Sequence, residues 1–133
     1  MKVILVVTDD ALMREIVGML QEQLGISMLV AECFEGGKEI LAEIVPDAVI
    51  TDYRFAPEKE TGLDVARLVQ GRTPPIPVLL MTAVDITGDL LEQCKNVGIG
   101  TVLSKSMEVA TLRRRIEQFI ASATTKAEGA VQS

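Results

Sequence analysis

Five short apolar runs alternate along this chain with longer segments that carry apolar residues at helical spacing. The runs are rich in Val, Ile and Leu and lack polar alternation, which is typical of strands buried on both faces. We expect these strands at Lys2–Val7, Met28–Cys33, Ala48–Thr51, Pro77–Met81 and Thr101–Leu103. Strands that alternate with helices through short links predict an α/β fold, in which helices cover both faces of a five-stranded parallel sheet.

The segments between the runs predict five helices. The first can be capped by Asp9 or Asp10 and ends at Gly25. Its apolar face consists of residues that recur every fourth position and of two beside them: Leu12, Ile16, Leu20 and Leu24, with Met13 and Val17. The others are expected between Gly36 and Pro46, then at Gly62–Gln70, Gly88–Val97 and Met107–Ala121. A chain of 133 residues suits one domain, which we place at 1–121. Residues 122–133 are small and polar, so we expect a disordered tail or a linker there.

Composition excludes several functional classes. The chain contains no histidine, so it has no Ser-His-Asp or Cys-His nucleophile system, no histidine-ligated metal and no phosphohistidine of its own. Its net charge of −6 argues against nucleic-acid binding through this domain. Cys33 and Cys94 have no CxxC spacing and are expected to be reduced and buried. No apolar run approaches the ~18 residues needed to span a bilayer, so we expect a cytoplasmic protein without a membrane segment.

Polar residues follow four of the five predicted strands. Asp9 and Asp10 follow the first, Asp52 the third, Thr82 the fourth and Lys105 the fifth. Ligands of open parallel sheets bind outside the carboxyl ends of the strands. In a doubly wound sheet of order 2-1-3-4-5, the first and third strands are central neighbours, so the three carboxylates are expected to meet there. Thr82 and Lys105 are then expected to one side.

Three neighbouring carboxylates repel one another, and at pH 7 they either retain protons or bind a cation. Ligands that are all oxygen favour Mg²⁺, or Mn²⁺ as its substitute, over zinc. A hydroxyl and an ammonium beside such a metal complete a site that can bind a phosphoryl group. This combination predicts that Asp52 is a carboxylate nucleophile that forms an acyl phosphate.

These residues, with the phrases DAVITDYRF, TGLDVARLV and VLLMTA, resemble the receiver domain of response regulators in two-component signalling. The resemblance runs from about Lys2 to Ala121 and implies the flavodoxin-like receiver fold. It implies that Asp52 is the phosphoacceptor, that Thr82 turns toward the phosphoryl oxygens and that Lys105 pairs with the acyl phosphate. Such a domain is not an enzyme on other substrates, because it catalyses only its own magnesium-dependent phosphorylation and dephosphorylation.

The resemblance also assigns metal ligands and partners. Asp10 and Asp52 match direct ligands of Mg²⁺, Asp9 matches an acid that acts through a metal-bound water, and Arg54 matches the position whose backbone carbonyl binds the metal. The phosphoryl donor would be a sensor histidine kinase or a phosphotransfer protein. The output partner is unknown. The basic run from Arg113 to Arg115 is either a solvated face or part of a homodimer or partner surface.

The chain departs from the family pattern beside the lysine. Ser106 stands where the family has a proline, and Val102 stands where it has an aromatic residue. Both departures favour an alternative function, that of a pseudo-receiver that binds partners without being phosphorylated. A small Mg²⁺-dependent phosphohydrolase that uses Asp52 is a third alternative. Arg54 and Val84 occupy positions that can control the attacking water, and we expect them to make the acyl phosphate relatively long-lived.

Overall fold

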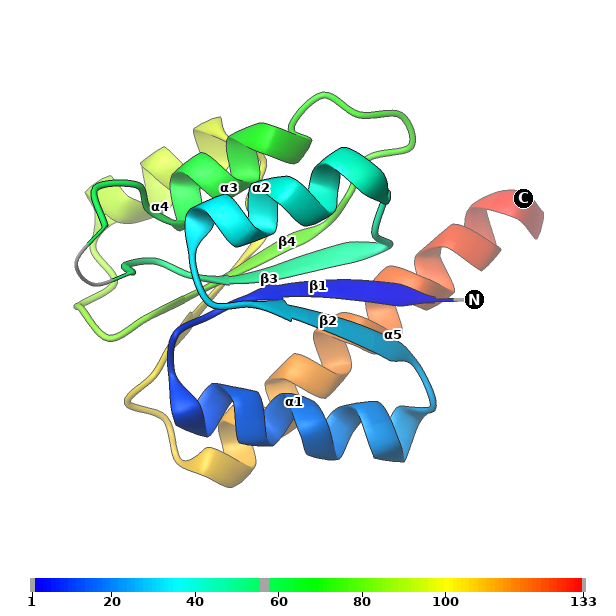
Figure 1. Ribbon diagram of the computed structural model, residues 1–133, viewed down its shortest axis with the longest axis horizontal. Helices are drawn as coiled ribbons and strands as arrows, with labels where there is room; N and C mark the ends of the chain where they lie inside the picture. Colours follow the sequence, from blue (N-terminus) through cyan, green and yellow to red (C-terminus); the bar gives the residue numbers. More distant parts are fainter. Residues whose placement is uncertain (1, 56–57, 133) are drawn as a thin grey trace.

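The computed structural model describes residues 2–55 and 58–132 of the chain. Its five strands form one parallel sheet in the order β2-β1-β3-β4-β5, which confirms the predicted fold class and topology (Figure 1). The strands are β1 (Val3–Val7), β2 (Ser27–Ala31), β3 (Ala48–Asp52), β4 (Val78–Thr82) and β5 (Thr101–Ser104). The helices are α1 (Ala11–Leu24), α2 (Phe34–Glu43), α3 (Gly62–Val69), α4 (Gly88–Asn96) and α5 (Val109–Gln132).

The sheet separates two apolar clusters. Helices α1 and α5 pack on one face and α2, α3 and α4 on the other (Figure 1). Successive residues of a strand point to opposite faces. Ile4 and Val6 therefore enter the α1–α5 cluster, while Leu5 and Val7 enter the opposite one. All four side chains are completely buried, so β1 packs helices on both of its faces and holds a central place in the sheet.

Helix α1 begins and ends as its sequence predicts. The Asp10 carboxylate accepts hydrogen bonds from the backbone N–H groups of Leu12 and Met13, and Gly25 ends the helix in the left-handed conformation, with φ of 64°. The expected inward stripe differs at its first residue, because Leu12 is exposed while Met13 beside it is buried. The cap therefore fixes the start of the helix directly beside the end of β1.

One other expectation is wrong in detail. Val45 was expected on the second helix, but α2 ends at Glu43 and the Val45 side chain is exposed. Helix α5 runs from Val109 to Gln132. The division into a domain and a linker remains a prediction. Among the residues described, no helix combines the length and the apolar character needed to cross a bilayer.

Candidate functional site

The carboxyl ends of β1, β3, β4 and β5 lie at one edge of the sheet. The register pairs Val7 with Thr51, Asp52 with Met81, and Thr82 with Ser104. This register places Thr8 and the residues after it beside Asp52, with Thr82 and Lys105 on the other side. Asp52 is only 1% exposed although it is the last residue of its strand. A charged group so deeply buried needs specific partners.

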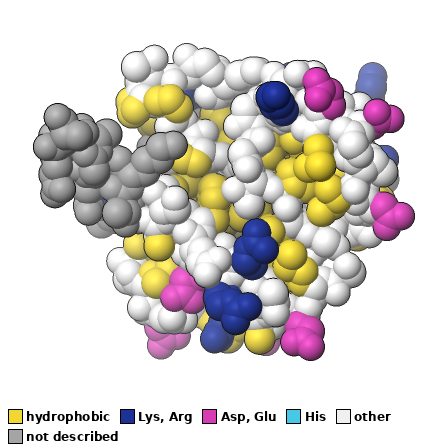
Figure 2. All heavy atoms as spheres, turned by 180° about the vertical axis from the view of Figure 1, so that it is seen from behind, with side chains coloured by type: hydrophobic (Ala, Val, Ile, Leu, Met, Phe, Trp, Pro, Cys, Tyr) yellow, Lys and Arg dark blue, Asp and Glu magenta, His cyan; other side chains and the backbone are white. Residues whose placement is uncertain are grey.

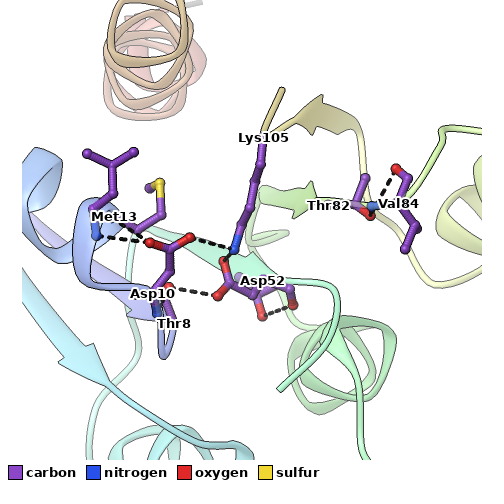
Figure 3. Close-up of polar contacts among 9 residues, drawn as sticks. Thr8, Asp10, Met13, Asp52, Thr82, Val84 and Lys105 are labelled. Atoms are coloured by element: carbon purple, nitrogen blue, oxygen red, sulfur yellow. Dashed lines mark hydrogen bonds and ion pairs between the residues drawn. The ribbon is translucent and has the colours of Figure 1, made fainter. Parts of the chain in front are cut away.

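Lys105 lies between two of the predicted carboxylates. Its Nζ is 3.0 Å from Asp52 Oδ1 and 3.1 Å from Asp10 Oδ2, and Figure 3 shows the three side chains converging. The two carboxylate oxygens are therefore within about 6 Å of each other. The chain thus brings residues from the ends of β1, β3 and β5 to one point.

Thr8 contacts Asp52 directly and was not among the predicted site residues. It is completely buried, and its hydroxyl donates a hydrogen bond of 2.7 Å to Asp52 Oδ2. The same hydroxyl oxygen accepts the backbone N–H of Asp10 at 3.1 Å. A hydroxyl directly before the acidic pair and at the end of a buried strand was the signal available in the sequence. Because Thr8 is uncharged and ends an apolar run, its position did not by itself indicate a role in the site.

The two oxygens of Asp52 have different surroundings. Oδ2 accepts the Thr8 hydroxyl, whereas Oδ1 is buried and forms an ion pair of 3.0 Å with the ammonium of Lys105. Among the described residues, no other group is hydrogen-bonded to Oδ1. Oδ1 is therefore the oxygen of Asp52 that faces the cation, and Oδ2 is the oxygen that the hydroxyl holds.

The ionisable groups influence one another strongly. Burial raises the pKa of Asp52 above its usual range, and it outweighs the opposing hydrogen bond from Thr8 and the charge of Lys105. The charge of Asp9 raises the pKa of Asp52 further. Burial also acts to raise the pKa of Asp10, but its ion pair with Lys105 and its helix-capping bonds outweigh that effect and lower it. Burial acts to lower the pKa of Lys105, yet the two carboxylates raise it, so the lysine is charged.

Asp9 does not join the two other carboxylates closely. Its side chain is exposed, and in the described part of the chain no three acidic, histidine or cysteine side chains are grouped to hold a metal ion. The structure therefore places Asp10 and Asp52 together around Lys105, with Asp9 acting on Asp52 through its charge. The metal-ligand roles of these residues remain predictions.

Thr82 lies at the predicted strand end but turns away from Asp52. Its hydroxyl oxygen accepts the backbone N–H of Val84 at 3.0 Å, and Figure 3 shows this pair apart from the group around Lys105. The side chain is 1% exposed. Thr82 reaches Lys105 through its backbone, since the Thr82 carbonyl accepts the Lys105 N–H at 2.8 Å.

Arg54 belongs to the loop after β3. Its guanidinium lies 5.0 Å from the centre of the Tyr53 ring, and its backbone pairs with Thr61. Arg54 and Val84 line the same cavity of about 390 Å³, together with Asp85 and residues at the start of α4. The two side chains expected to control water therefore line one cavity.

The turn after Lys105 forms without the proline of the family pattern. The Ser104 and Ser106 hydroxyls lie 2.6 Å apart, and the Ser106 N–H donates to Ser104 Oγ at 3.1 Å. Within the described residues the only cis peptide bond is Thr73–Pro74, so the bond between Lys105 and Ser106 is trans. Two serine side chains thus shape the turn that carries the lysine.

Gly62 brings the start of α3 against the backbone of Asp52. A Cβ atom at this position would lie 2.3 Å from the Asp52 carbonyl oxygen and 2.5 Å from Leu80 Cδ1. The Gly62 N–H donates to the Tyr53 carbonyl at 2.8 Å. Only a glycine permits this approach, so the residue helps to fix the end of β3.

Comparison with known proteins gives the same assignment along most of the chain. Residues 4–117 match the family model of the response regulator receiver domain. Among curated proteins, a cyclic di-GMP phosphodiesterase from Thermotoga maritima is 25% identical over 113 residues, which are 85% of this chain and 29% of that protein. The chain therefore spans less than a third of that relative.

Solved structures share the fold. A response regulator from Thermotoga maritima has a TM-score of 0.71 and 21% identity, covering 91% of this chain and 98% of that one. A CheY-like receiver domain protein from Methanospirillum hungatei JF-1 has a TM-score of 0.76 and 15% identity, over 95% and 98%. The receiver domain of a sensor histidine kinase from Pseudomonas aeruginosa PAO1, with magnesium coordinated in its active-site cleft, has a TM-score of 0.68 and 23% identity, over 91% and 98%.

Proposed function

We propose that this chain, which belongs to the response regulator receiver domain family, accepts a phosphoryl group on Asp52 and passes on the signal by protein contact. The observation that carries the proposal is Asp52 Oδ1. This oxygen is buried and lies 3.0 Å from the Lys105 ammonium, and no other group in the described part of the chain is hydrogen-bonded to it. A carboxylate oxygen placed in this way can act as a nucleophile while a fixed cation neutralises the incoming charge.

The transfer step follows from this geometry. Asp52 Oδ1 forms a bond to phosphorus as the donor's bond to phosphorus breaks, and the leaving group keeps the electron pair. The donor is a phosphohistidine on a sensor histidine kinase or a phosphotransfer protein, and its imidazole is the leaving group. Lys105 offsets the charge of the transferred group, because its ammonium already faces Oδ1. Thr82 would have to leave its bond to Val84 before its hydroxyl could contact the phosphoryl oxygens.

A divalent cation fits the charges of this site. Asp9, Asp10 and Asp52 carry three formal negative charges against the single positive charge of Lys105, and oxygen ligands suit Mg²⁺ or Mn²⁺. We propose that Asp10, Asp52 and the backbone carbonyl of Arg54 bind the metal directly and that Asp9 acts through a metal-bound water. Bound there, Mg²⁺ would neutralise charge on the phosphoryl oxygens.

The proposal is tested by incubating the protein with Mg²⁺ and acetyl phosphate, followed by intact mass measurement. Wild type should gain one phosphoryl group, and Asp52→Asn should gain none. Glu22→Gln is the matched control, because it removes the same charge from an exposed residue of α1 and should be phosphorylated normally. Phosphorylation of Asp52→Asn, or no adduct on wild type, would contradict the proposal.

The partner surface is proposed from exposed side chains. Large hydrophobic residues are exposed in and before α4 and at the start of α5, among them Ile86, Leu91 and Val109. Seen from behind the view of Figure 1, hydrophobic side chains lie at the surface between basic groups (Figure 2). Arg114 and Arg115 on α5 are exposed as well. We propose this face for an output partner or a second copy of the chain.

A pseudo-receiver remains the second candidate function. It is favoured by the position of Lys105, which already pairs with both Asp10 and Asp52, and by Ser106 and Val102 at positions that depart from the family pattern. In that case the ion pairs would be structural and the domain would bind partners in one form. The mass experiment separates the two functions, because a pseudo-receiver gains no phosphoryl group.

A further inference from the structure

Thr8 is the second partner of the Asp52 carboxylate. Among the described residues, it supplies the one side-chain hydroxyl that donates to that carboxylate, over 2.7 Å to Oδ2. Its oxygen accepts the Asp10 N–H at 3.1 Å, so the hydroxyl proton is left to point at Asp52. The neighbouring Thr82 hydroxyl is engaged with Val84 instead. Both Thr8 and Asp52 are almost completely excluded from solvent, with exposures of 0% and 1%.

We propose that Thr8 is a positioning residue that holds the Asp52 carboxylate by Oδ2 and shortens the lifetime of the acyl phosphate formed on Oδ1. The inference rests on the proposed function, since it concerns the product that Asp52 would form. Lys105 contacts Oδ1 and Thr8 contacts Oδ2, so the carboxylate is held from two sides and its two oxygens are not equivalent.

The effect on lifetime follows from the change in charge at Oδ2. In the free carboxylate Oδ2 shares the negative charge, whereas in the acyl phosphate it is the oxygen of a neutral carbonyl. Hydrogen bonds to charged acceptors are roughly twice as strong as those to neutral ones. The Thr8 hydroxyl therefore stabilises the carboxylate more than it stabilises the acyl phosphate.

Hydrolysis restores that charge. A water oxygen bonds to phosphorus, the bond between Oδ1 and phosphorus breaks, and its electron pair returns to the Asp52 carboxylate. The products are the carboxylate and inorganic phosphate, and the proton released by water goes to phosphate or solvent. In a loose transition state the departing carboxylate already carries most of its charge. Thr8 therefore stabilises the transition state of hydrolysis more than the acyl phosphate.

The forward reaction should respond much less. There the carboxylate is charged both in the free protein and in a loose transition state, so the hydrogen bond from Thr8 has similar strength in both. Removing the hydroxyl should then change the rate of phosphorylation by acetyl phosphate less than about twofold, while hydrolysis slows about fivefold. That fivefold change corresponds to about 1 kcal/mol.

The experiment compares wild type with Thr8→Val, which keeps the shape and removes the hydroxyl, and Thr8→Ser, which keeps the hydroxyl. Each protein is phosphorylated with acetyl phosphate and Mg²⁺ and separated from the donor, and the adduct is followed by intact mass. Thr8→Val should lose its phosphoryl group about fivefold more slowly than wild type, and Thr8→Ser should decay within about twofold of wild type. Thr8→Cys, a weaker donor of similar size, should lie between them and replaces Thr8→Val if that variant does not fold.

The outcomes separate the inference from the proposed function. If wild type forms no adduct, the proposed function fails and this inference fails with it. If wild type is phosphorylated but Thr8→Val and Thr8→Cys decay at its rate or faster, only the role of Thr8 is overturned. General damage to the site would slow phosphorylation as well and would not be reversed in Thr8→Ser. Slower decay with normal phosphorylation, restored by serine, would establish the role.

Discussion

Replacing Gly62 by alanine should destabilise the fold through a single steric contact. The added Cβ would lie 2.3 Å from the carbonyl oxygen of Asp52, whereas heavy atoms normally pack at about 3.5 Å. The oxygen cannot move away easily, because it belongs to the central strand β3, which is hydrogen-bonded to β1 and β4. The start of α3 must therefore move outward by about 1 Å.

That movement disrupts well-packed surroundings. It weakens the bond between the Gly62 N–H and the Tyr53 carbonyl, and the new methyl group also meets Leu80, which is completely buried. Overpacking of a core typically costs about 1–3 kcal/mol, and two clashes near 2.5 Å place this site at the upper end, about 2–3 kcal/mol. For a domain of this size, the melting temperature should fall by roughly 10 °C.

Gly18 supplies the matched control. It lies within α1, is exposed, and has no atom within 4 Å of the position that a Cβ would take. Gly18→Ala should therefore raise stability by up to about 1 kcal/mol, as expected for alanine within a helix. Urea unfolding followed by far-ultraviolet circular dichroism measures both variants, since the chain has no tryptophan. A midpoint of Gly62→Ala equal to that of wild type, with a normal gain for Gly18→Ala, would refute the steric argument.

Three further predictions concern the cap, the pH dependence and the adduct. Thr61→Ala removes the side chain that caps α3 and should lower stability by about 1 kcal/mol, seen as a lower urea midpoint. Because the pKa of Asp10 is lowered by folding, the stability that it contributes is present above its unfolded value of 3.8 and is lost at lower pH. The difference in urea midpoint between wild type and Asp10→Asn should therefore shrink below pH 3.8, and a constant difference would count against the ion pair. Arg54→Asn should speed hydrolysis of the adduct severalfold if Arg54 and Val84 shield it from water, and an unchanged rate would disprove that role.

The topology and the clustering of polar residues could be predicted because both depend on periodicity. Uninterrupted apolar runs identify buried parallel strands, and the carboxyl ends of such strands share one edge. That reasoning located Asp52 at the end of β3 and brought Asp10 and Lys105 to it, as the ion pairs show. It required no knowledge of side-chain conformation.

The details that were missed depend on side-chain direction and on competing partners. Leu12 and Met13 both belong to the apolar face expected for α1, and the sequence does not distinguish the exposed Leu12 from the buried Met13. The Thr82 hydroxyl donates to the Val84 carbonyl and accepts the Val84 N–H, and these two hydrogen bonds hold it away from Asp52. Thr8 looks like the end of an apolar run in the sequence, and its hydroxyl gains a partner only when β1 and β3 pair.

Asp52 affects both the stability of the fold and the proposed chemistry, but the protonation state that favours the fold is not the one that reacts. Burial raises its pKa above 3.8, so the protonated form is the one that folding favours, and ionisation of Asp52 lowers stability as the pH rises through its folded value. The nucleophile, however, must be the ionised form. Thr8 and Lys105 both act to lower that pKa, and they therefore oppose the effect of burial and favour the ionised carboxylate. It follows that Asp52→Asn, which removes the buried charge, should gain stability relative to wild type as the pH rises above 4, while it loses the proposed reaction. A urea midpoint of Asp52→Asn that fell below that of wild type at pH 7 would mean that the contacts with Thr8 and Lys105 stabilise the charge more than burial opposes it.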